Sequence, residues 1–188
     1  MKLFIDTHLN DIVILLVDNN KIIKKEIVSN VKKTSTMIMP TIVNVIGENK
    51  LSLIIVVNGP GSFTGVRLGV TIAKTLAHTL NIPIKTVTSL EQMAVSLEES
   101  DKIVAFSDKN GYYVGIFNSD NNLIGEYEYL SNSEYEIYSS KYEIITNVAI
   151  NYEKVIEFAD KKDSITPHKV NPIYIKKLDV EKWLEKLQ

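Results

Sequence analysis

The sequence has 188 residues, of which 45% are hydrophobic and 23% charged, with a formal net charge of −2 and no cysteine. This composition excludes a disordered chain, and the lack of a basic excess argues against a protein that holds a nucleic acid by itself. Without cysteine there are no disulfides, thiolate metal ligands or cysteine nucleophile, which suits a reducing compartment.

The first residues, MKLFIDTHLNDIVILLV, are interrupted by Asp6 and Asp11, so we expect no signal peptide there. No uncharged apolar run approaches the roughly 20 residues that a membrane-spanning helix needs. We therefore expect a cytoplasmic protein that does not contact a membrane.

Three runs rich in β-branched residues, KLFID, DIVILLV and KIIKKEIV, open the chain and predict an antiparallel meander. A helix is predicted next at about 36–46, then a strand at 51–57, a helix at about 64–80, the short strand IKTVT and a helix from about Ser89. The continuous apolar run at 51–57 predicts a strand that is covered on both faces. This order predicts an α/β protein with a mixed sheet, of the actin-like or ribonuclease H-like fold.

The pattern restarts near residue 101 with three more candidate strands, KIVAFSD, GYYVGIFN and NLIGEYEYL. The remaining patterns predict a loop, a weak helix and a final amphipathic helix, at 131–140, 152–159 and 179–187. We therefore expect an N-terminal lobe at 1–100 and a reduced C-terminal lobe at 101–188.

A glycine-rich loop, NGPGSFTGVRLG, occupies residues 58–69 between a predicted strand and a helix. Such a loop often binds phosphate, but here Gly65 is followed by Val66 and Arg67, not by the lysine and hydroxyl of a P-loop. The spacing from Gly59 through Gly61 to Gly65 also misses the dinucleotide fingerprint by one residue.

Two interpretations of this loop remain open. In the structural one, Ser62 or Thr64 caps the following helix, and Gly59 and Gly61 are free to adopt positive φ. In the other, the backbone at the helix start forms an anion-binding nest. We favour the structural interpretation, in which the loop residues that matter are Gly59, Gly61, Ser62, Gly65 and Gly69.

The helix after the loop carries a ridge of small residues, Gly65, Gly69, Ala73 and Ala77, which allows another backbone to approach closely. Its apolar character extends about 200° around the axis, beyond what one sheet can cover. Over residues 34–84, a span of 51 residues, there are only four formal charges. Such a surface predicts an interface with another protein, unless the second lobe covers it.

No catalytic or metal site is predicted. His8, His78 and His168 are far apart in sequence, and no serine lies in a nucleophile-elbow motif. Asp6 and Thr7 end the first strand without a glycine that would let the backbone wrap a phosphate. We therefore interpret Asp6 as structural and expect no catalytic residue and no metal ligand.

The segments GPGSFTGVRLG and AKTLAHTLNIPIKTVTSLEQMA closely resemble the signature of the bacterial TsaB (YeaZ) family. LFIDT at the start, the S-x-x-x-M-P pattern at 35–40 and PIYIKKLDVEKW at 172–183 resemble it as well. Two segments depart from the family pattern, namely Thr34 in place of a histidine and the segment FSDKNGYY at 106–113.

The resemblance implies an actin-like fold and a non-catalytic subunit of the machinery that makes threonylcarbamoyladenosine at position 37 of tRNA. The implied partners are a TsaD-like catalytic paralogue, a TsaE-like ATPase and, when alone, a second copy of the chain, with tRNA contacted only through the complex. No cofactor of its own is implied, and ATP or ADP at the complex interface is left open. The implied interface falls on Met37, Met39, Pro40 and Val43 of the first helix and on Arg67, Leu68, Thr71, Ile72 and Thr75 of the second.

Two other functions remain as alternatives: an actin-like enzyme such as a transferase, kinase or peptidase with a degenerate site, and a homodimer that only covers its own helices.

Overall fold

A computed structural model describes residues 1–30, 33–98 and 100–176, so the final helix expected at 179–187 lies outside the described residues. The chain divides into two compact units. The first comprises Met1–Glu98 and Val148–Ile173, and the second comprises the other described residues. Within the described ranges, no helix combines the length and the apolar character that crossing a lipid bilayer requires.

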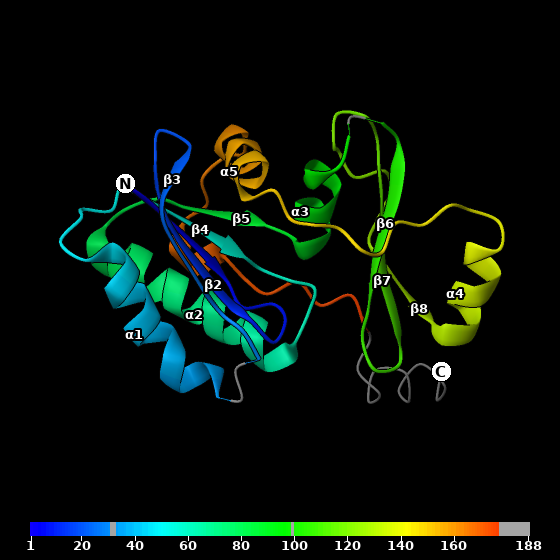
Figure 1. Cartoon of the computed structure of the whole chain (residues 1–188), viewed down its shortest axis with the longest axis horizontal. Helices are drawn as coiled ribbons and strands as arrows, with labels where there is room; N and C mark the ends of the chain where they lie inside the picture. The colour runs from blue at the N-terminus through cyan, green and yellow to red at the C-terminus, as the bar shows by residue number, and fades with distance from the viewer. Residues whose placement is uncertain (31–32, 99, 177–188) are drawn as a thin grey trace. The chain divides into compact units, whose positions relative to one another are not determined.

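The first unit is built on a mixed five-stranded sheet in the order β3-β2-β1-β4-β5 (Figure 1). β1, β2 and β3 form the expected antiparallel meander, and β4 and β5 continue the sheet parallel to β1. The turn between β2 and β3 uses Asn19 and Asn20, which both have positive φ, as a tight two-residue hairpin requires. The strands are β1 (Lys2–Asp6), β2 (Ile12–Asp18), β3 (Lys21–Val28), β4 (Leu53–Val57) and β5 (Ile84–Val87).

Helices cover both faces of this sheet. Figure 1 shows α1 (Thr34–Ile46) and α2 (Phe63–Leu80) on one face, with α3 (Ser89–Ser96) and α5 (Tyr152–Lys161) on the other. Each face has its own apolar core, because alternate residues of a strand point to opposite sides. Leu3 and Ile5 of β1 contribute to the core under α1 and α2, whereas Phe4 contributes to the core under α3 and α5. We call these the first and the second core.

β4 is buried at all five positions, which confirms the expectation of a strand covered on both faces. Its residues alternate between the two cores, with Ile54 and Val56 in the first and Leu53, Ile55 and Val57 in the second.

The segment 148–173 belongs to the first unit, although the sequence analysis placed every residue after 100 in the second lobe. The physical reason is the apolar face of α5, where Val155, Ile156 and Ala159 are fully buried in the second core. Lys2 also forms an ion pair with Asp160 of this helix. Without α5, a large part of this face of the sheet would lack a cover.

The described residues of the second unit form an antiparallel sheet in the order β6-β7-β8 and the helix α4. Its elements are β6 (Lys102–Ser107), β7 (Gly111–Phe117), β8 (Glu128–Ser131) and α4 (Asn132–Ser139). Two expectations were wrong here. The third strand is confined to 128–131, and the segment 131–140, expected to be a loop, contains α4.

α4 begins at a capping box, in which the Ser131 side chain accepts a hydrogen bond from the Glu134 backbone and the Glu134 side chain accepts one from the Ser131 backbone. No residue of α4 is buried. Its covered side consists of the half-buried Tyr135 and Tyr138, of which Tyr135 stacks on Tyr112 of β7, and two aromatic residues are too few for hydrophobic periodicity to predict a helix.

Candidate functional site

The glycine loop connects β4 to α2 and ends in a helix cap. Ser62 is the N-cap, and its hydroxyl accepts a hydrogen bond from the Gly65 backbone N–H at 3.3 Å. Gly59 has a φ of 102°, in the region that favours glycine, as the sequence predicted. Gly61 has no positive φ. Glycine is required there because a side chain would not fit.

The first strand approaches α2 so closely that no side chain fits between them. A Cβ added at Gly61 would lie 2.3 Å from the carbonyl oxygen of His8, and one added at Gly65 would lie 2.1 Å from that of Thr7. A Cβ at Gly69 would lie 2.4 Å from the Thr7 hydroxyl, which donates a hydrogen bond to the Gly65 carbonyl at 2.7 Å. The small-residue ridge predicted from sequence thus receives the end of β1.

The polar backbone atoms of the loop are bonded to other parts of the first unit. The Ser62 N–H donates to the His8 carbonyl at 2.7 Å, and the Ser89 N–H donates to the Gly59 carbonyl at 3.0 Å. The Ser89 hydroxyl donates to the Pro60 carbonyl at 2.7 Å. An anion nest would use backbone N–H groups, and those of Ser62 and Gly65 already donate to protein oxygens, which favours the structural interpretation.

A buried carboxylate, Asp6, lies at the carboxyl end of β1. Its Oδ1 accepts hydrogen bonds from the His8 backbone N–H at 2.9 Å and pairs with His8 Nδ1 at 2.6 Å, while Oδ2 accepts one from Gln92 Nε2 at 3.1 Å. Burial alone would raise the pKa of Asp6, but the charge and hydrogen bonds of His8, together with Gln92, hold this pKa below its ordinary value. The sequence analysis found Asp6 but neither of its partners.

The outward surface of α1 is apolar and uncharged. Ile38, Thr41, Ile42 and Val45 face the first core. On the other side, the exposed fractions of Met37, Met39 and Val43 are 41%, 39% and 63%. Pro40 is also exposed and lies inside the helix, at its seventh residue, where the missing N–H removes the hydrogen bond that another residue would donate to the Thr36 carbonyl.

The neighbouring surface of α2 is mixed. Arg67, Thr71 and Thr75 are exposed, whereas Leu68 and Ile72 are partly buried and pack against the first core. The family resemblance implied that Ile72 lies on the interface, yet this residue is only partly exposed, because the first core reaches further around α2 than one sheet would imply.

Phe63 was not among the predicted surface residues, yet 52% of it is exposed and the Arg67 guanidinium lies 3.5 Å from its ring centre. The sequence did contain a signal for this pair: Phe63 is the first residue of the helix, and Arg67 follows four residues later, at the spacing that brings two side chains together on one face. We call the exposed residues Met37, Met39, Pro40, Val43, Phe63, Arg67, Thr71 and Thr75, with the partly buried Leu68 and Ile72, the outward face.

The second unit has its own polar cluster, in the segment that departs from the family pattern. The Asp108 carboxylate accepts hydrogen bonds from the Tyr129 hydroxyl at 2.7 Å and from Lys176 Nζ at 3.1 Å. Burial would raise the pKa of Asp108, but these bonds and that of the Asn110 N–H hold it below its ordinary value. The cluster binds residue 176 to the strands of this unit and shows no open catalytic geometry.

A comparison with protein-family models decides the family. The model described as "TsaD: tRNA N6-adenosine threonylcarbamoyltransferase" matches residues 21–116, slightly more than half of the chain. The chain belongs to this family. Its curated relatives are named TsaB, which confirms the resemblance to the TsaB (YeaZ) family that the motifs indicated.

A relative from Bacillus subtilis (strain 168), described as "tRNA threonylcarbamoyladenosine biosynthesis protein TsaB", is 37% identical over 130 residues, which is 65% of this chain and 57% of the relative. The protein with the same description from Buchnera aphidicola subsp. Acyrthosiphon pisum (strain APS) is 33% identical over 108 residues, which is 51% of this chain and 49% of the relative. The chain thus spans about half the length of the curated relatives it matches.

Two solved structures are similar along nearly their whole length. An uncharacterized protein with similarity to peptidase YEAZ from Pseudomonas aeruginosa has a TM-score of 0.77 and 16% identity, with coverage of 93% of this chain and 99% of that one. YeaZ from Pseudomonas aeruginosa has a TM-score of 0.75 and 16% identity, with coverage of 92% and 99%. This likeness and the strand order confirm the predicted actin-like fold of the α/β class.

Proposed function

We propose that this protein is a non-catalytic scaffold subunit for the threonylcarbamoyladenosine modification at position 37 of tRNA. In this proposal it acts in the cytoplasm and binds a TsaD-like catalytic paralogue and a TsaE-like ATPase, and it contacts tRNA only through the complex. The names of its relatives support the pathway. The outward face of the first unit supports the role as a binding subunit.

The observation that carries the proposal is the apolar surface of α1. This helix has no formal charge along its 13 residues, and three large apolar side chains, Met37, Met39 and Val43, stand on its exposed side. A contiguous exposed apolar patch on a soluble protein typically marks an interface. Methionine adds to this, because its flexible side chain adapts to different partners.

The α2 side supplies residues typical of an interface centre. Arginine and aromatic side chains carry much of the binding energy at protein interfaces, and here Arg67 stacks on Phe63. Thr71 and Thr75 continue the exposed strip along the helix, and the Thr75 hydroxyl bonds to the Thr71 carbonyl at 2.9 Å. The strip is therefore smooth and of low charge, which suits the close approach of another helix.

The contacts of Asp6 with His8 and Gln92 support the proposal that the chain catalyses no reaction by itself. Both carboxylate oxygens of Asp6 accept hydrogen bonds within the protein, and the N–H groups of Ser62 and Gly65 are engaged. We expect no reaction of the isolated protein with ATP, or with threonylcarbamoyl-adenylate and tRNA. Single-turnover transfer by the pure chain would contradict this.

The test of the binding role compares two matched substitutions. Val43→Glu places a charge on the outward face, where 63% of the side chain is exposed, and Ile137→Glu makes the same change on α4, where 61% is exposed. Val43→Glu should weaken association with the TsaD-like paralogue by at least about tenfold, because an unpaired charge would be buried at the interface. Ile137→Glu should leave this association unchanged.

The measurements are titration calorimetry with the purified paralogue and formation of the modified nucleoside in a reconstituted reaction. Equal binding by both variants would refute the outward face as the interface. Size-exclusion chromatography of the mixture separates the scaffold from a simple homodimer: a heterodimer should replace the homodimer, and persistence of the homodimer would favour the alternative.

A further inference from the structure

A pocket of about 420 Å³ lies in the first unit, beside the C-terminal end of α2, and none of the residues that line it belongs to the outward face. Its polar wall is formed by His78, Asn81, Ser164, Thr166 and His168. The segments 77–83 and 164–168 that build it are more than 80 residues apart in sequence. An apolar floor, which includes Ile82 and Ile165, joins it to the first core.

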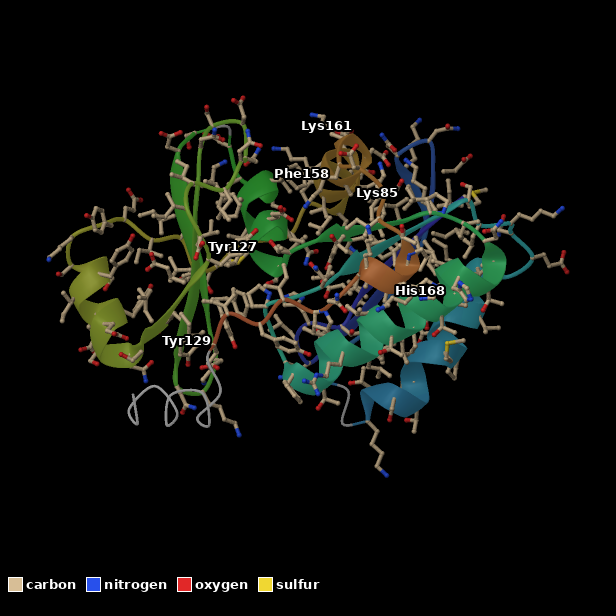
Figure 2. The ribbon with its side chains drawn as sticks, turned by 180° about the vertical axis from the view of Figure 1, so that it is seen from behind. Lys85, Tyr127, Tyr129, Phe158, Lys161 and His168 are labelled. Atoms are coloured by element: carbon tan, nitrogen blue, oxygen red, sulfur yellow. The ribbon has the colours of Figure 1, made fainter. Side chains whose placement is uncertain are left out.

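Backbone contacts fix the second of these segments. Ile165 pairs with Ile84 of β5 as an isolated bridge, with the Ile165 N–H donating to the Ile84 carbonyl at 2.8 Å. The short helix η1 (Pro167–Lys169) follows directly and packs on α2. Figure 2 shows His168 on η1, beside the C-terminal part of α2.

Two imidazoles meet in this pocket. His78, in the last turn of α2, and His168 have ring centres 4.9 Å apart and planes inclined by 61°. Because metal–nitrogen bonds to imidazole are about 2.0–2.1 Å, a ring centre lies about 3.2 Å from a metal bound to one of its nitrogens. Two centres 4.9 Å apart then subtend about 100° at a shared ion, near the tetrahedral angle of zinc sites.

We propose that His78 and His168 form a binding site for a divalent transition-metal ion of the Zn²⁺ type. Imidazole is a preferred ligand of such ions. Water, or an oxygen-bearing small ligand held in the pocket, completes the coordination. Among the described residues, no group of three or more histidine and carboxylate side chains is placed to hold a metal, so this is an open site with two protein ligands.

The local field favours a cation over an anion here. The C-terminal end of a helix carries about half a negative charge, which attracts cations within the last turn. Neither imidazole makes a hydrogen bond or an ion pair with another described residue, so both can turn a nitrogen lone pair toward an ion. Lys74 opposes a bound cation, because its Nζ donates to the His168 carbonyl at 3.4 Å.

A histidine metal site was not expected, because the three histidines are far apart in sequence. The sequence could not reveal a pair whose members come from α2 and η1, because only the fold brings them together.

The experiment titrates untagged protein with Zn²⁺ by calorimetry. We expect one ion per chain, and His78→Ala and His168→Ala should each weaken binding by at least about tenfold, because each removes one of two protein ligands. Lys74→Gln should strengthen binding by a few fold, because it removes a nearby positive charge. Both histidines are exposed, so the variants should fold, as circular dichroism can verify.

The third histidine, His8, provides an internal reference for metal binding. It pairs with Asp6 and does not line the pocket. In imidazole ¹⁵N spectra, the signals of His78 and His168 should shift together on addition of one equivalent of Zn²⁺, while those of His8 stay in place. Absence of saturable binding, or undiminished binding by both alanine variants, would overturn the proposal.

Discussion

Substitution of Gly69 by alanine tests the close contact between α2 and the end of β1. Alanine is the better helix former, and in an open helix interior this change stabilises by about 1 kcal/mol. Here, however, the new Cβ would lie 2.4 Å from the Thr7 hydroxyl, far inside ordinary contact distance. The next nearest atoms, Thr7 Cβ and Ile5 Cγ2, lie at 3.7 and 3.8 Å and can be tolerated. The hydroxyl is therefore the one obstacle.

The clash should outweigh the propensity gain. Thr7 is 1% exposed and cannot swing into solvent, so an overpacking cost of about 1–3 kcal/mol applies. Displacing the Thr7 hydroxyl also breaks its bond to the Gly65 carbonyl, at about 1 kcal/mol. The net loss is about 2 kcal/mol, which for a chain of this length lowers the melting temperature by about 4–8 °C.

A double-mutant cycle isolates the cause. Thr7→Ala removes the hydroxyl and should cost about 1–2 kcal/mol through the lost hydrogen bond and methyl packing. In that background, Gly69→Ala no longer meets the hydroxyl and should stabilise by up to about 1 kcal/mol. The coupling energy is then about 3 kcal/mol, well above the error of urea unfolding curves.

A Gly69→Ala variant with a higher free energy of unfolding than the wild type, or losses of the two single variants that simply add, would contradict this cause. Thr71→Ala on the exposed side of the same helix is the matched control and should be neutral or slightly stabilising.

Three further predictions follow from individual contacts. Ile72→Glu should lower the free energy of unfolding by about 1–3 kcal/mol because Ile72 packs against the first core, whereas Val43→Glu should change it by less than about 0.5 kcal/mol, both measured in urea. Asp6→Asn should lower the free energy of unfolding at neutral pH. Because the pKa of Asp6 is depressed in the folded state, its stabilisation is present above the ordinary pKa and is lost as pH falls through the folded value. The free energies of unfolding of the two proteins should therefore converge in acid, and a difference that stays constant with pH would contradict the pairing with His8. Ser131→Ala should weaken the start of α4 by about 1 kcal/mol, visible as faster amide exchange in that helix, and unchanged exchange would show that the capping box contributes nothing.

The first unit was largely predictable because its signals are local. Apolar runs predict β1, β2 and β4, and Ser62 before a glycine-spaced helix marks the start of α2. Each of these patterns reports burial or capping within a few residues of itself, so a single sequence suffices to interpret it.

The misses share a physical origin in contacts between distant segments. The return of 148–173 to the first unit depends on which sheet the apolar face of α5 meets, and the sequence of α5 does not state that. Asp6 is hydrogen-bonded to His8, two residues further on, and to Gln92 of α3, and the ring of His78 contacts that of His168 on η1. α4 was missed for a different reason: the helix is short and has no buried residue, so the S-x-x-E capping box is its main signal in the sequence.

The route of the chain through the first unit has a consequence for biosynthesis. A nascent polypeptide that has emerged from the ribosome only as far as residue 98 has five strands but no α5, so Phe4, Leu15 and Ile55 lack part of their cover. The segment up to residue 147 must be translated before α5 can close that side. During this interval the uncovered apolar face of the sheet is exposed to aggregation and to chaperones that bind such surfaces. A chain truncated before residue 148 should therefore be insoluble.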